Sequence, residues 1–407
     1  MTDTTDLASY DKSRINSFTN KTTLKELIDE YIEILGKSAG YSAFELVIFN
    51  SFIKSKNIKF ISRFSNIFPI RNAVDLRDIE GTHYLYNASF MKFESENTYF
   101  ASHCPIYNND DPSNNDIDLF LKMLIDNDIK IVCIPIQFLS DISRTYKWFP
   151  DEITDTKSYT VSNTKTEPSR NFDYTLRCPS KKVIYDPDVV EPKEDDESIK
   201  IFNVRITDNL NHKEHEIQIY QYNNWPDYGV PRRLNLLCAY IYRIWFNLFN
   251  LKDNKKVLVH CSAGVGRTGT VISCIELLNK INAEYLNLTS LDDKTKITYK
   301  ENKEESLNKL NSFILSNIVF MRIHRPLMVQ KENQLRAILA LKDFYTETDP
   351  ERIRETLNRI LTKYTGEGNS EDKNKNFFSY GDDKLTGGSR RKIRNRIYSY
   401  TLEYDYF

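Results

Sequence analysis

The stretch VHCSAGVGRTGT, residues 259–270, limits the fold of this chain more than any other part of the sequence. The short apolar run 256–260 is typical of a buried strand, and residues 268–281 have the spacing of a helix. Between them lie a cysteine, an arginine and two glycines, which allow the backbone to curl tightly, and a third glycine follows at the start of the helix. The pattern therefore predicts a strand, a tight loop and the N-terminus of a helix, in that order.

The side chains of this loop indicate phosphate chemistry. Backbone N–H groups that point inward at the start of a helix form a binding site for an anion. The same field favours the thiolate of Cys261, which is the stronger nucleophile. Arg267 carries a planar guanidinium that matches two oxygens of one phosphate. We therefore predict a site in which the sulfur of Cys261 attacks the phosphorus of a bound phosphate. The alternative is a chance glycine-rich turn around a buried cysteine.

Another phosphate-binding loop, GxxxxGK[ST], fits this stretch less well. That pattern depends on a lysine and needs no cysteine. Residues 259–270 contain no lysine, whereas they do contain Cys261 and Arg267. The sequence therefore favours attack by a cysteine over the binding of a nucleotide.

Strand and helix patterns alternate over roughly 300 residues. Apolar runs and alternation predict strands at 84–103, 130–136, 199–206, 214–222 and 256–260. Helical spacing predicts helices at 116–125, 234–249, 268–281, 307–323, 333–345 and 351–364. Residues 151–198 are rich in Thr, Pro and charged residues and are predicted to form long loops, and 282–305 read as a charged insertion. We expect one α/β domain, with a twisted mixed sheet flanked by helices.

The two ends of the chain differ from this central part. Residues 1–20 are polar and predicted to be disordered, and residues 24–35 and 42–53 have helical spacing. Residues 365–389 have the composition of a linker, and 390–396 form a basic run that suits acidic lipid, nuclear import or a solvated tail. The predicted divisions are an extension at 1–40, a catalytic domain at 41–348, and a helix, linker and tail at 349–407.

Composition excludes several classes of protein. The net charge of −1 over 407 residues gives no indication of a nucleic-acid or membrane partner. The first residues lack the apolar core of a signal peptide, and apolar runs such as 131–136 are too short to span a bilayer. We expect a cytoplasmic protein, with a nuclear location left open by the basic run.

Metal binding is not expected from the sequence. The six cysteines form no CxxC pair and are interpreted as reduced thiols. His212 and His215 are spaced closely enough to suggest metal ligands, but a polar turn before a strand is the simpler interpretation. We therefore expect neither a metal nor another cofactor.

Several motifs together resemble the tyrosine-specific branch of the cysteine-dependent protein tyrosine phosphatases. The stretch HCSAGVGRTG is similar to the signature loop of that family, and WPDYGVP at 225–231 is similar to its mobile WPD loop. QKENQ at 330–334 resembles the family's Q loop, with Lys331 in place of a threonine. Residues 86–89 and 99–105 resemble two of its strands, and Arg322 and Arg325 two arginines before the Q loop. The resemblance covers about residues 41–348.

The resemblance implies roles for individual residues. Cys261 would be the nucleophile, Arg267 the phosphate ligand, and Asp227 the acid that protonates the leaving phenolate and later the base. Gln330 would position water, Thr268 would help the sulfur leave, and His260 would orient the loop. The substrate-binding residues implied are Ser262, Ala263, Gly264, Val265, Gly266, Phe64 and Gln334. The loop around Asp227 would be framed by Trp225, Pro226, Gly229 and Pro231.

The chain departs from the family pattern at Phe64. The family has a tyrosine there, which flanks the ring of phosphotyrosine. A phenylalanine ring can still stack on an aryl group, so selectivity for a deep phosphotyrosine is retained in this interpretation. The insertion 282–305 is also longer than expected. These differences put peptide specificity in doubt rather than the reaction.

Three functions remain open at this point. The first is an active phosphatase of phosphotyrosine proteins, with kinases among the possible substrates and no nucleic-acid partner. The second is a phosphatase of broader range, acting also on phosphoserine, phosphothreonine or phosphoinositides. The third is a scaffold that binds phosphotyrosine without turnover. Nothing in the sequence indicates the oligomeric state.

Two sequence features weigh between these functions. Lipid-type signature loops usually add lysines, and here Ser262, Ala263 and Val265 add no charge. A scaffold usually lacks the cysteine, the arginine or the aspartate, and this chain has all three.

Overall fold

The structure is a computed structural model. It describes residues 54, 58–62, 64, 67–69, 72–77, 81–107, 115–138, 145–153, 155–160, 172–189, 191, 193, 196–289, 298–362 and 365–367. The predictions for 1–20, 24–35 and 42–53 lie outside these residues, as does the basic run at 390–396. The proposed domain limits therefore stay predictions.

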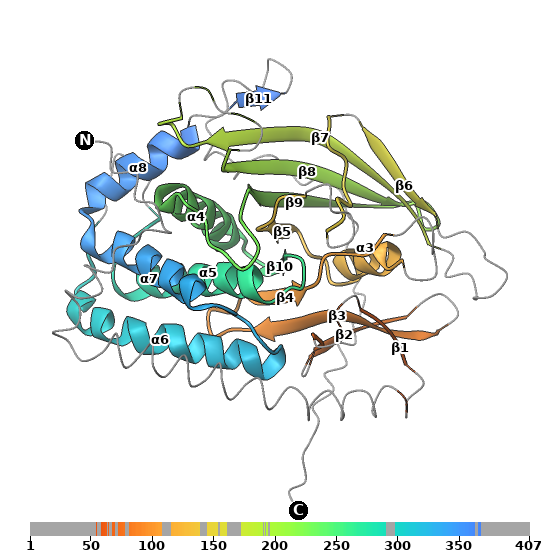
Figure 1. Ribbon diagram of the computed structural model, residues 1–407, viewed down its shortest axis with the longest axis horizontal. Coiled ribbons are helices and arrows are strands. Elements are labelled where there is room, and N and C mark those ends of the chain that lie inside the picture. Colours follow the sequence, from red (N-terminus) through yellow and green to blue (C-terminus); the bar gives the residue numbers. More distant parts are fainter. Residues whose placement is uncertain are drawn as a thin grey trace, which may run out of the picture.

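A twisted mixed sheet of eleven strands forms the centre of the described part of the chain (Figure 1). The order along the sheet is β1-β3-β4-β10-β5-β9-β8-β7-β11, with β2 paired to β3 and β6 paired to β7. The strands are β1 Lys59–Ile61, β2 Ala73–Arg77, β3 His83–Lys92, β4 Thr98–Ser102, β5 Ile131–Ile134, β6 Thr156–Thr160, β7 Asp173–Tyr185, β8 Ser198–Asp208, β9 Lys213–Asn223, β10 Lys256–His260 and β11 Thr365–Glu367.

Four neighbouring strands, β4, β10, β5 and β9, run parallel at the middle of the sheet. Parallel strands are usually covered on both faces, which accounts for the continuous apolar run in β10. Alternate residues of β10 enter different cores: Val257 and Val259 lie in one cluster, and Leu258 lies in the other. Because parallel strands all end at the same edge, the loops after these four strands meet there.

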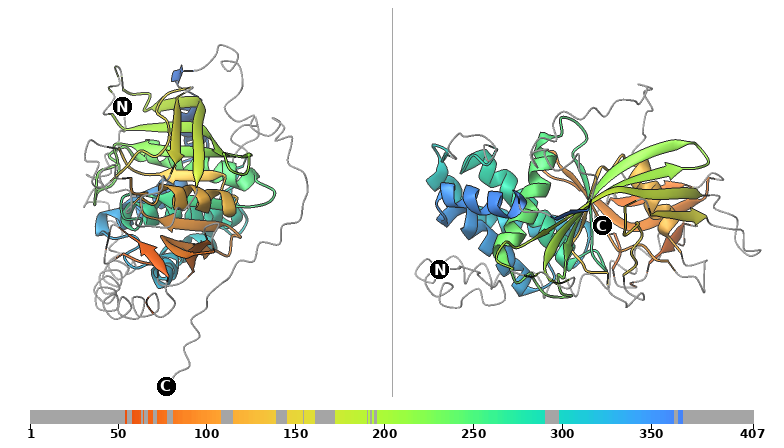
Figure 2. Two further views of the ribbon diagram at one scale, coloured as in Figure 1. Left: turned by 90° about the vertical axis from the view of Figure 1, so that its right-hand side faces the viewer. Right: turned by 90° about the horizontal axis from the view of Figure 1, so that it is seen from above.

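The helices are distributed unequally over the two faces of the sheet. Helices α4 to α8 gather on one side, and α3 lies on the other (Figures 1 and 2). Their bounds are α3 Ile117–Asp126, α4 Leu234–Asn250, α5 Gly266–Glu284, α6 Lys303–His324, α7 Glu332–Glu347 and α8 Pro350–Thr362. All six overlap the helices predicted from spacing, and the mixed sheet confirms the predicted α/β class. Among the described residues, no helix has the length and apolar character needed to cross a bilayer.

The prediction of long loops over residues 151–198 is wrong for residues 156–160 and 173–185, which form strands. This region contains β6 and the thirteen-residue strand β7, which pairs with β8. Leu176 and Cys178 of β7 are fully buried. The charged and threonine residues that suggested a loop are mostly the exposed or half-buried half of an alternating pattern, and sheet pairing outweighs weak local propensity here.

The region 282–305 is partly helical. The last residues of α5 and the first of α6 lie inside it, and Leu286 forms an isolated bridge with Tyr299. Residues 290–297 are outside the described part. The beginning of the predicted linker also has structure, because β11 pairs with β7.

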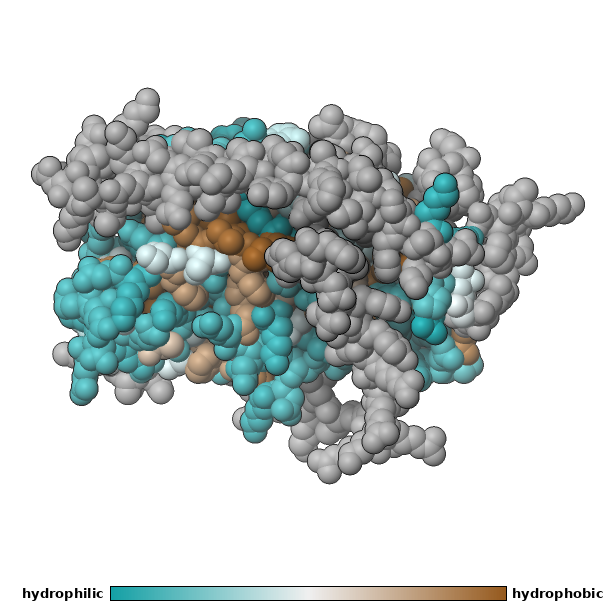
Figure 3. All heavy atoms as spheres, turned by 90° about the horizontal axis from the view of Figure 1, so that it is seen from below, coloured by the Kyte–Doolittle hydropathy of each residue, from teal (hydrophilic) through white to brown (hydrophobic). Residues whose placement is uncertain are grey.

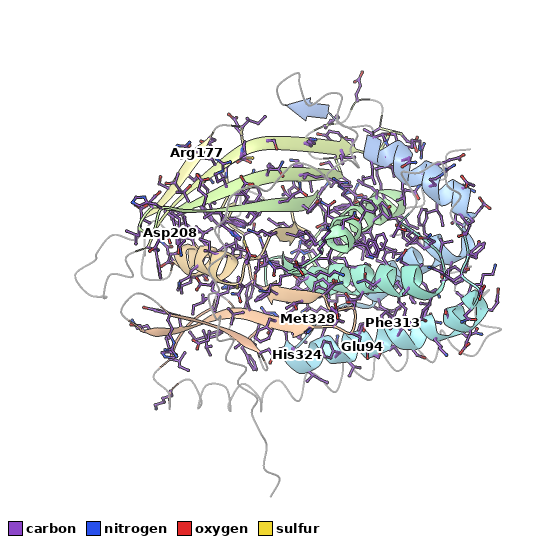
Figure 4. The ribbon with its side chains drawn as sticks, turned by 180° about the vertical axis from the view of Figure 1, so that it is seen from behind. Glu94, Arg177, Asp208, Phe313, His324 and Met328 are labelled. Atoms are coloured by element: carbon purple, nitrogen blue, oxygen red, sulfur yellow. The ribbon has the colours of Figure 1, made fainter. Side chains whose placement is uncertain are left out.

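Helix α6 lies low in the view of Figure 1, and the coloured part of the surface seen from below is mostly hydrophilic with smaller apolar areas (Figure 3). Val319 and Ile323 of this helix are exposed. His324 ends this helix, and Met328 lies nearby in the loop 325–331 that leads to α7 (Figure 4). Arg322 donates to the carbonyl oxygens of Met328 and Val329, both at 2.8 Å, and so fixes that loop.

Candidate active site

Cys261 follows directly after β10, at the edge where the parallel strands end. It lies at the base of a cavity of about 260 Å³. The lining residues come from four segments that are far apart in the chain: Phe64, Ile67, Asp227, Tyr228, Cys261, Ser262, Ala263, Val265, Gly266, Arg267, Gln330 and Gln334. The structure therefore brings together most of the residues that the sequence singled out.

A buried arginine from the end of α6 holds the loop after β10 in shape. Arg325 donates to the carbonyl oxygens of Gly264, at 2.8 Å, and Ala263, at 2.9 Å. Its third bond is to Asn87 Oδ1, at 2.8 Å. Burial lowers the pKa of Arg325 to about 9. Because Arg325 binds these two carbonyl groups, they point away from the concave side of the loop. That side can therefore present N–H groups to an anion.

The pKa of the Cys261 thiol is lowered from its ordinary value, although burial alone would raise it. The positive charge of Arg267 is the largest opposing effect, followed by hydrogen bonding from the Thr268 hydroxyl and from the N–H groups of Thr268 and Val265. The Thr268 side chain is fully buried next to the loop, where it helps to lower this pKa. These donors lie at the N-terminus of α5, where the helix field also favours an anion.

Arg267 contacts the loop that carries Asp227. Its Nη2 lies 2.9 Å from Asp227 Oδ1, and its Nη1 donates to the Trp225 carbonyl at 3.0 Å. The arginine side chain is 7% exposed, whereas that of Asp227 is 48% exposed. An arriving phosphate would compete with Asp227 for the guanidinium, because both are anions that bind through oxygen.

The loop around Asp227 is braced from within and from α7. Trp225 Nε1 donates to the Gly229 carbonyl at 3.0 Å. A Cβ on Gly229 would lie 2.6 Å from the Pro226 ring, so this tight turn depends on glycine. Asn333 Nδ2 donates to the Tyr228 carbonyl at 3.2 Å, and Lys331 Nζ lies 5.4 Å from the centre of the Tyr228 ring. Pro231 is buried beyond the turn.

The two glutamines of the segment 330–334 are placed differently. Both line the cavity, but Gln334 is buried, and its Oε1 accepts from the backbone N–H of Gln330 at 2.8 Å and of Lys331 at 3.2 Å. A Cβ on Gly266 would lie 2.8 Å from Gln334 Nε2, so this side chain packs directly on the Cys261 loop. Gln334 therefore braces Gln330 against the loop.

His260 is fully buried behind the loop. Its Nε2 accepts from Trp148 Nε1 at 3.1 Å, and its Nδ1 lies 3.3 Å from the Cys261 carbonyl. Because an indole can only donate, Nε2 must be the unprotonated nitrogen, and Nδ1–H is left for the carbonyl. Burial lowers the pKa of His260 from 6.5 to about 3. Neutral His260 therefore donates to the carbonyl of Cys261 and fixes the position of that residue.

Phe64 lies at the rim of the cavity, half-buried, with Ile67 beside it. The Ser62 hydroxyl bonds to the backbone of Phe64, accepting from its N–H at 3.2 Å and donating to its carbonyl at 3.0 Å. Asn87 Nδ2 donates to the Ile67 carbonyl at 2.8 Å. Asn87 thereby links this rim to Arg325 and the Cys261 loop.

The alternative metal ligands lie away from this site. His212 is exposed in the turn before β9, and His215 lies on β9 with Nε2 2.8 Å from the Ile129 carbonyl. In the part of the chain that the structure describes, no cluster of three or more His, Cys, Asp or Glu residues is placed to hold a metal ion.

Comparison with known proteins agrees with the site. Residues 59–342 match the family model described as protein-tyrosine phosphatase. This chain belongs to the protein-tyrosine phosphatase family. The phosphatase match covers every strand of the sheet except β11, and all of the residues that line the cavity.

Individual relatives match shorter parts of the phosphatase. Receptor-type tyrosine-protein phosphatase eta of Mus musculus is 33% identical over 125 residues, which is 30% of this chain and 8% of that protein. Tyrosine-protein phosphatase 3 of Schizosaccharomyces pombe is 25% identical over 238 residues, 54% of this chain and 64% of that protein. Tyrosine-protein phosphatase 1 of Dictyostelium discoideum is 24% identical over 243 residues, 57% of this chain and 42% of that protein. The chain thus spans less than a tenth of the receptor-type relative.

Several residues of the phosphatase site were not found from the sequence. Ile67 and Tyr228 line the cavity, Asn87 and Trp148 lie behind it, and Asn333 contacts the loop of Asp227. Asn87 lies within the segment 86–89, which resembles a family strand, and this was the available signal. Ile67 carries none, because its place depends on a contact between distant segments.

Gly264 in this phosphatase loop is expected to tolerate no side chain. Its φ is +73°, and a Cβ there would lie 2.0 Å from the Ser102 carbonyl oxygen. Gly264→Ala should therefore lower the free energy of unfolding by about 2–5 kcal/mol, from backbone strain and overpacking together. Chemical denaturation measures this loss.

Gly81→Ala provides a matched control. Gly81 has a φ of +81°, and a Cβ added there would meet no other atom within 4 Å. Only backbone strain remains at this position, worth about 1–2 kcal/mol. Equal losses in the two variants would show that the close approach to Ser102 has no energetic importance.

His260 is expected to make the phosphatase sensitive to acid. Its pKa is about 3 when folded, against 6.5 ordinarily, so only the unfolded chain takes up its proton between these values. Its contribution is complete above pH 6.5 and is lost progressively as the pH falls toward about 3. The free energy of unfolding of His260→Asn should therefore fall less between about pH 7 and pH 4.5 than that of the unmodified protein. The exposed His212→Asn should follow the unmodified protein, and identical slopes in all three would contradict the prediction.

Proposed function

We propose that this chain hydrolyses phosphotyrosine in proteins through a cysteinyl-phosphate intermediate on Cys261. The observation that carries the proposal is the lowered pKa of Cys261 at the base of a cavity that also contains Arg267 and Asp227. A thiolate, a guanidinium and a carboxyl group from separate segments provide a nucleophile, a phosphate ligand and a proton donor.

The first step forms one bond and breaks another. The Cys261 thiolate attacks phosphorus, and the bond between phosphorus and the phenolic oxygen breaks. Asp227 gives its proton to that oxygen, so that tyrosine leaves as the neutral phenol. Arg267 and the N–H groups of the loop bind the phosphoryl oxygens, where negative charge must be stabilised.

The second step returns the enzyme to its first state. Gln330, which lines the cavity, holds a water molecule against the phosphorus. Asp227, now a carboxylate, takes a proton from that water as the new phosphorus–oxygen bond forms. The sulfur–phosphorus bond breaks, with Thr268 donating to the sulfur, and inorganic phosphate is released.

Two features of the cavity favour phosphotyrosine. Phe64 and Ile67 provide an apolar wall at the rim, which suits an aryl ring above the phosphate site. Among the described residues that line the cavity, Arg267 is the only cation, which gives little support for a headgroup with several phosphates. A phosphatase of broader range and a scaffold without turnover are the two alternatives. A place in cytoplasmic phosphotyrosine signalling belongs to the same proposal.

The proposal is tested by phosphate release from a panel of substrates in the presence of EDTA. The panel contains phosphotyrosine, phosphoserine and phosphothreonine peptides and phosphoinositides. Release from phosphotyrosine peptides alone is the expected result. Preferred release from phosphoinositides would overturn the substrate class, and tight phosphopeptide binding with no release would indicate the scaffold.

A further inference from the structure

Glu197 is a buried carboxylate outside the cavity that accepts three hydrogen bonds. Its Oε1 accepts from the Arg232 N–H at 2.6 Å, and its Oε2 accepts from the Arg233 N–H at 3.0 Å. The Tyr222 hydroxyl donates to Oε2 at 3.0 Å. The side chain is 5% exposed, so each of these bonds replaces contact with water. Burying a carboxylate is unfavourable unless it is hydrogen-bonded, so Glu197 depends on all three of these donors.

Two of the three bonds are made at the start of α4. This helix has Arg233 as its N-cap, has no side-chain cap of its own, and has no acidic residue in its first turn. The first N–H groups of a helix lack partners within it and carry partial positive charge. Glu197, which lies 35 residues earlier than Arg232 in the chain, accepts from the N-cap residue Arg233 and from the residue just before it, and so holds the backbone where it enters the helix.

The third bond is made at the other end of the loop that carries Asp227. Tyr222 lies near the end of β9, and its ring packs edge-on against Trp225 with 5.6 Å between ring centres. The carbonyl of Asp196, beside Glu197, accepts from Asn223 Nδ2 at 3.4 Å. The pair 196–197 thus contacts both the strand that enters the loop 224–231 and the helix that leaves it.

We propose that Glu197 is a positioning residue for Asp227, because its carboxylate joins the two ends of the loop 224–231. The inference rests on the proposed function, in which Asp227 protonates the leaving group. Glu197 touches neither the cavity nor the reacting atoms, so its effect passes through Tyr222, Trp225 and the backbone at 232–233.

The arrangement depends on the charge and both oxygens of Glu197. A glutamine of the same shape has one acceptor oxygen, so Glu197→Gln leaves at least one buried donor without a partner. Burial raises the pKa of Glu197, and the N–H groups of Arg232 and Arg233 oppose that rise. In Glu197→Gln, the loop 224–231 should therefore spend less time with Asp227 over the cavity.

The test compares two substrates that depend differently on the acid. A phosphotyrosine peptide has a poor leaving group and needs a proton from Asp227, whereas dinitrophenyl phosphate has a good one. In Glu197→Gln we expect kcat/KM, which reports only the steps up to departure of the phenol, to fall about tenfold for the peptide and less than about twofold for dinitrophenyl phosphate, because acid help is worth about 10²–10⁴-fold in all. KM for the peptide should change less than kcat.

Glu216→Gln is the matched control. Glu216 is an exposed residue of β9 that pairs with Arg205 at 2.8 Å, away from the loop. It should leave both rates unchanged. Tyr222→Phe removes one of the three bonds and should reduce the peptide rate in the same direction by a smaller factor, and it covers the case in which Glu197→Gln fails to fold.

The outcomes separate the inference from the function on which it rests. If Glu197→Gln and Tyr222→Phe both reduce the two rates equally, or leave both unchanged, the positioning role is wrong. If the unmodified protein releases phosphate from neither substrate, the proposed function has failed instead.

Discussion

Replacing Cys261 by serine should abolish turnover and leave phosphotyrosine binding intact. The serine hydroxyl lacks the lowered pKa that Arg267 and the loop N–H groups give to the Cys261 thiol, so no comparable anion is available to attack phosphorus. Loss of a covalent nucleophile reduces kcat by on the order of 10⁵-fold or more. Phosphate release and phosphopeptide binding by calorimetry measure the two effects separately.

Cys274→Ser serves as the matched control for this change. Cys274 lies on α5, the helix that begins in the same loop, but burial raises its pKa well above the ordinary thiol value. An inert buried thiol should be dispensable for turnover even if the variant is somewhat less stable. Retention of substantial activity in Cys261→Ser would contradict the assignment of the nucleophile.

Asp227→Asn is expected to produce the second largest effect. An amide of the same shape cannot protonate the phenolic oxygen, so kcat/KM for a phosphotyrosine peptide, which reports the step in which the phenol leaves, should fall by about 10²–10⁴-fold. The loss should be much smaller for dinitrophenyl phosphate, whose leaving group needs little help. Steady-state kinetics with the two substrates measures the difference.

The same substitution should strengthen substrate binding. Asp227 lies 2.9 Å from Arg267 and competes with phosphate for that guanidinium. Removing its negative charge frees Arg267 and reduces repulsion of the bound dianion. The Kd for a phosphopeptide, measured in a Cys261→Ser background to prevent turnover, should therefore decrease. Weaker binding in Asp227→Asn would show that the ion pair does not compete with substrate.

The centre of the fold was predictable from sequence because local patterns and tertiary structure agree there. The run 256–260 became β10 with the predicted bounds, and the glycine loop leads into α5 as expected. The prediction failed for β7, whose register is set by β8 rather than by its own residues. Pairing between strands is not visible in a single segment, and the mixed polar composition suggested a loop instead.

The candidate site likewise has residues that the sequence predicted and residues that it did not. Motifs carry their own signal, so Cys261, Arg267, Asp227 and Gln330 were singled out and are brought together in one cavity. The residues that hold them in place come from elsewhere. Glu197, just before β8, binds the backbone that leads into α4, and a buried glutamate in a charged stretch has no pattern that distinguishes it from a solvated one.

The most direct test of the whole mechanism is detection of phosphate on Cys261. Gln330→Ala should slow hydrolysis of the intermediate, because the water molecule loses its partner, without removing the nucleophile or the acid. The variant would be mixed with a phosphotyrosine peptide, quenched in acid within milliseconds and digested for mass spectrometry. The mechanism predicts a phosphoryl group on the peptide that contains Cys261 and none in the Cys261→Ser variant. Rapid phosphate release with no phosphoryl group on Cys261 would contradict it.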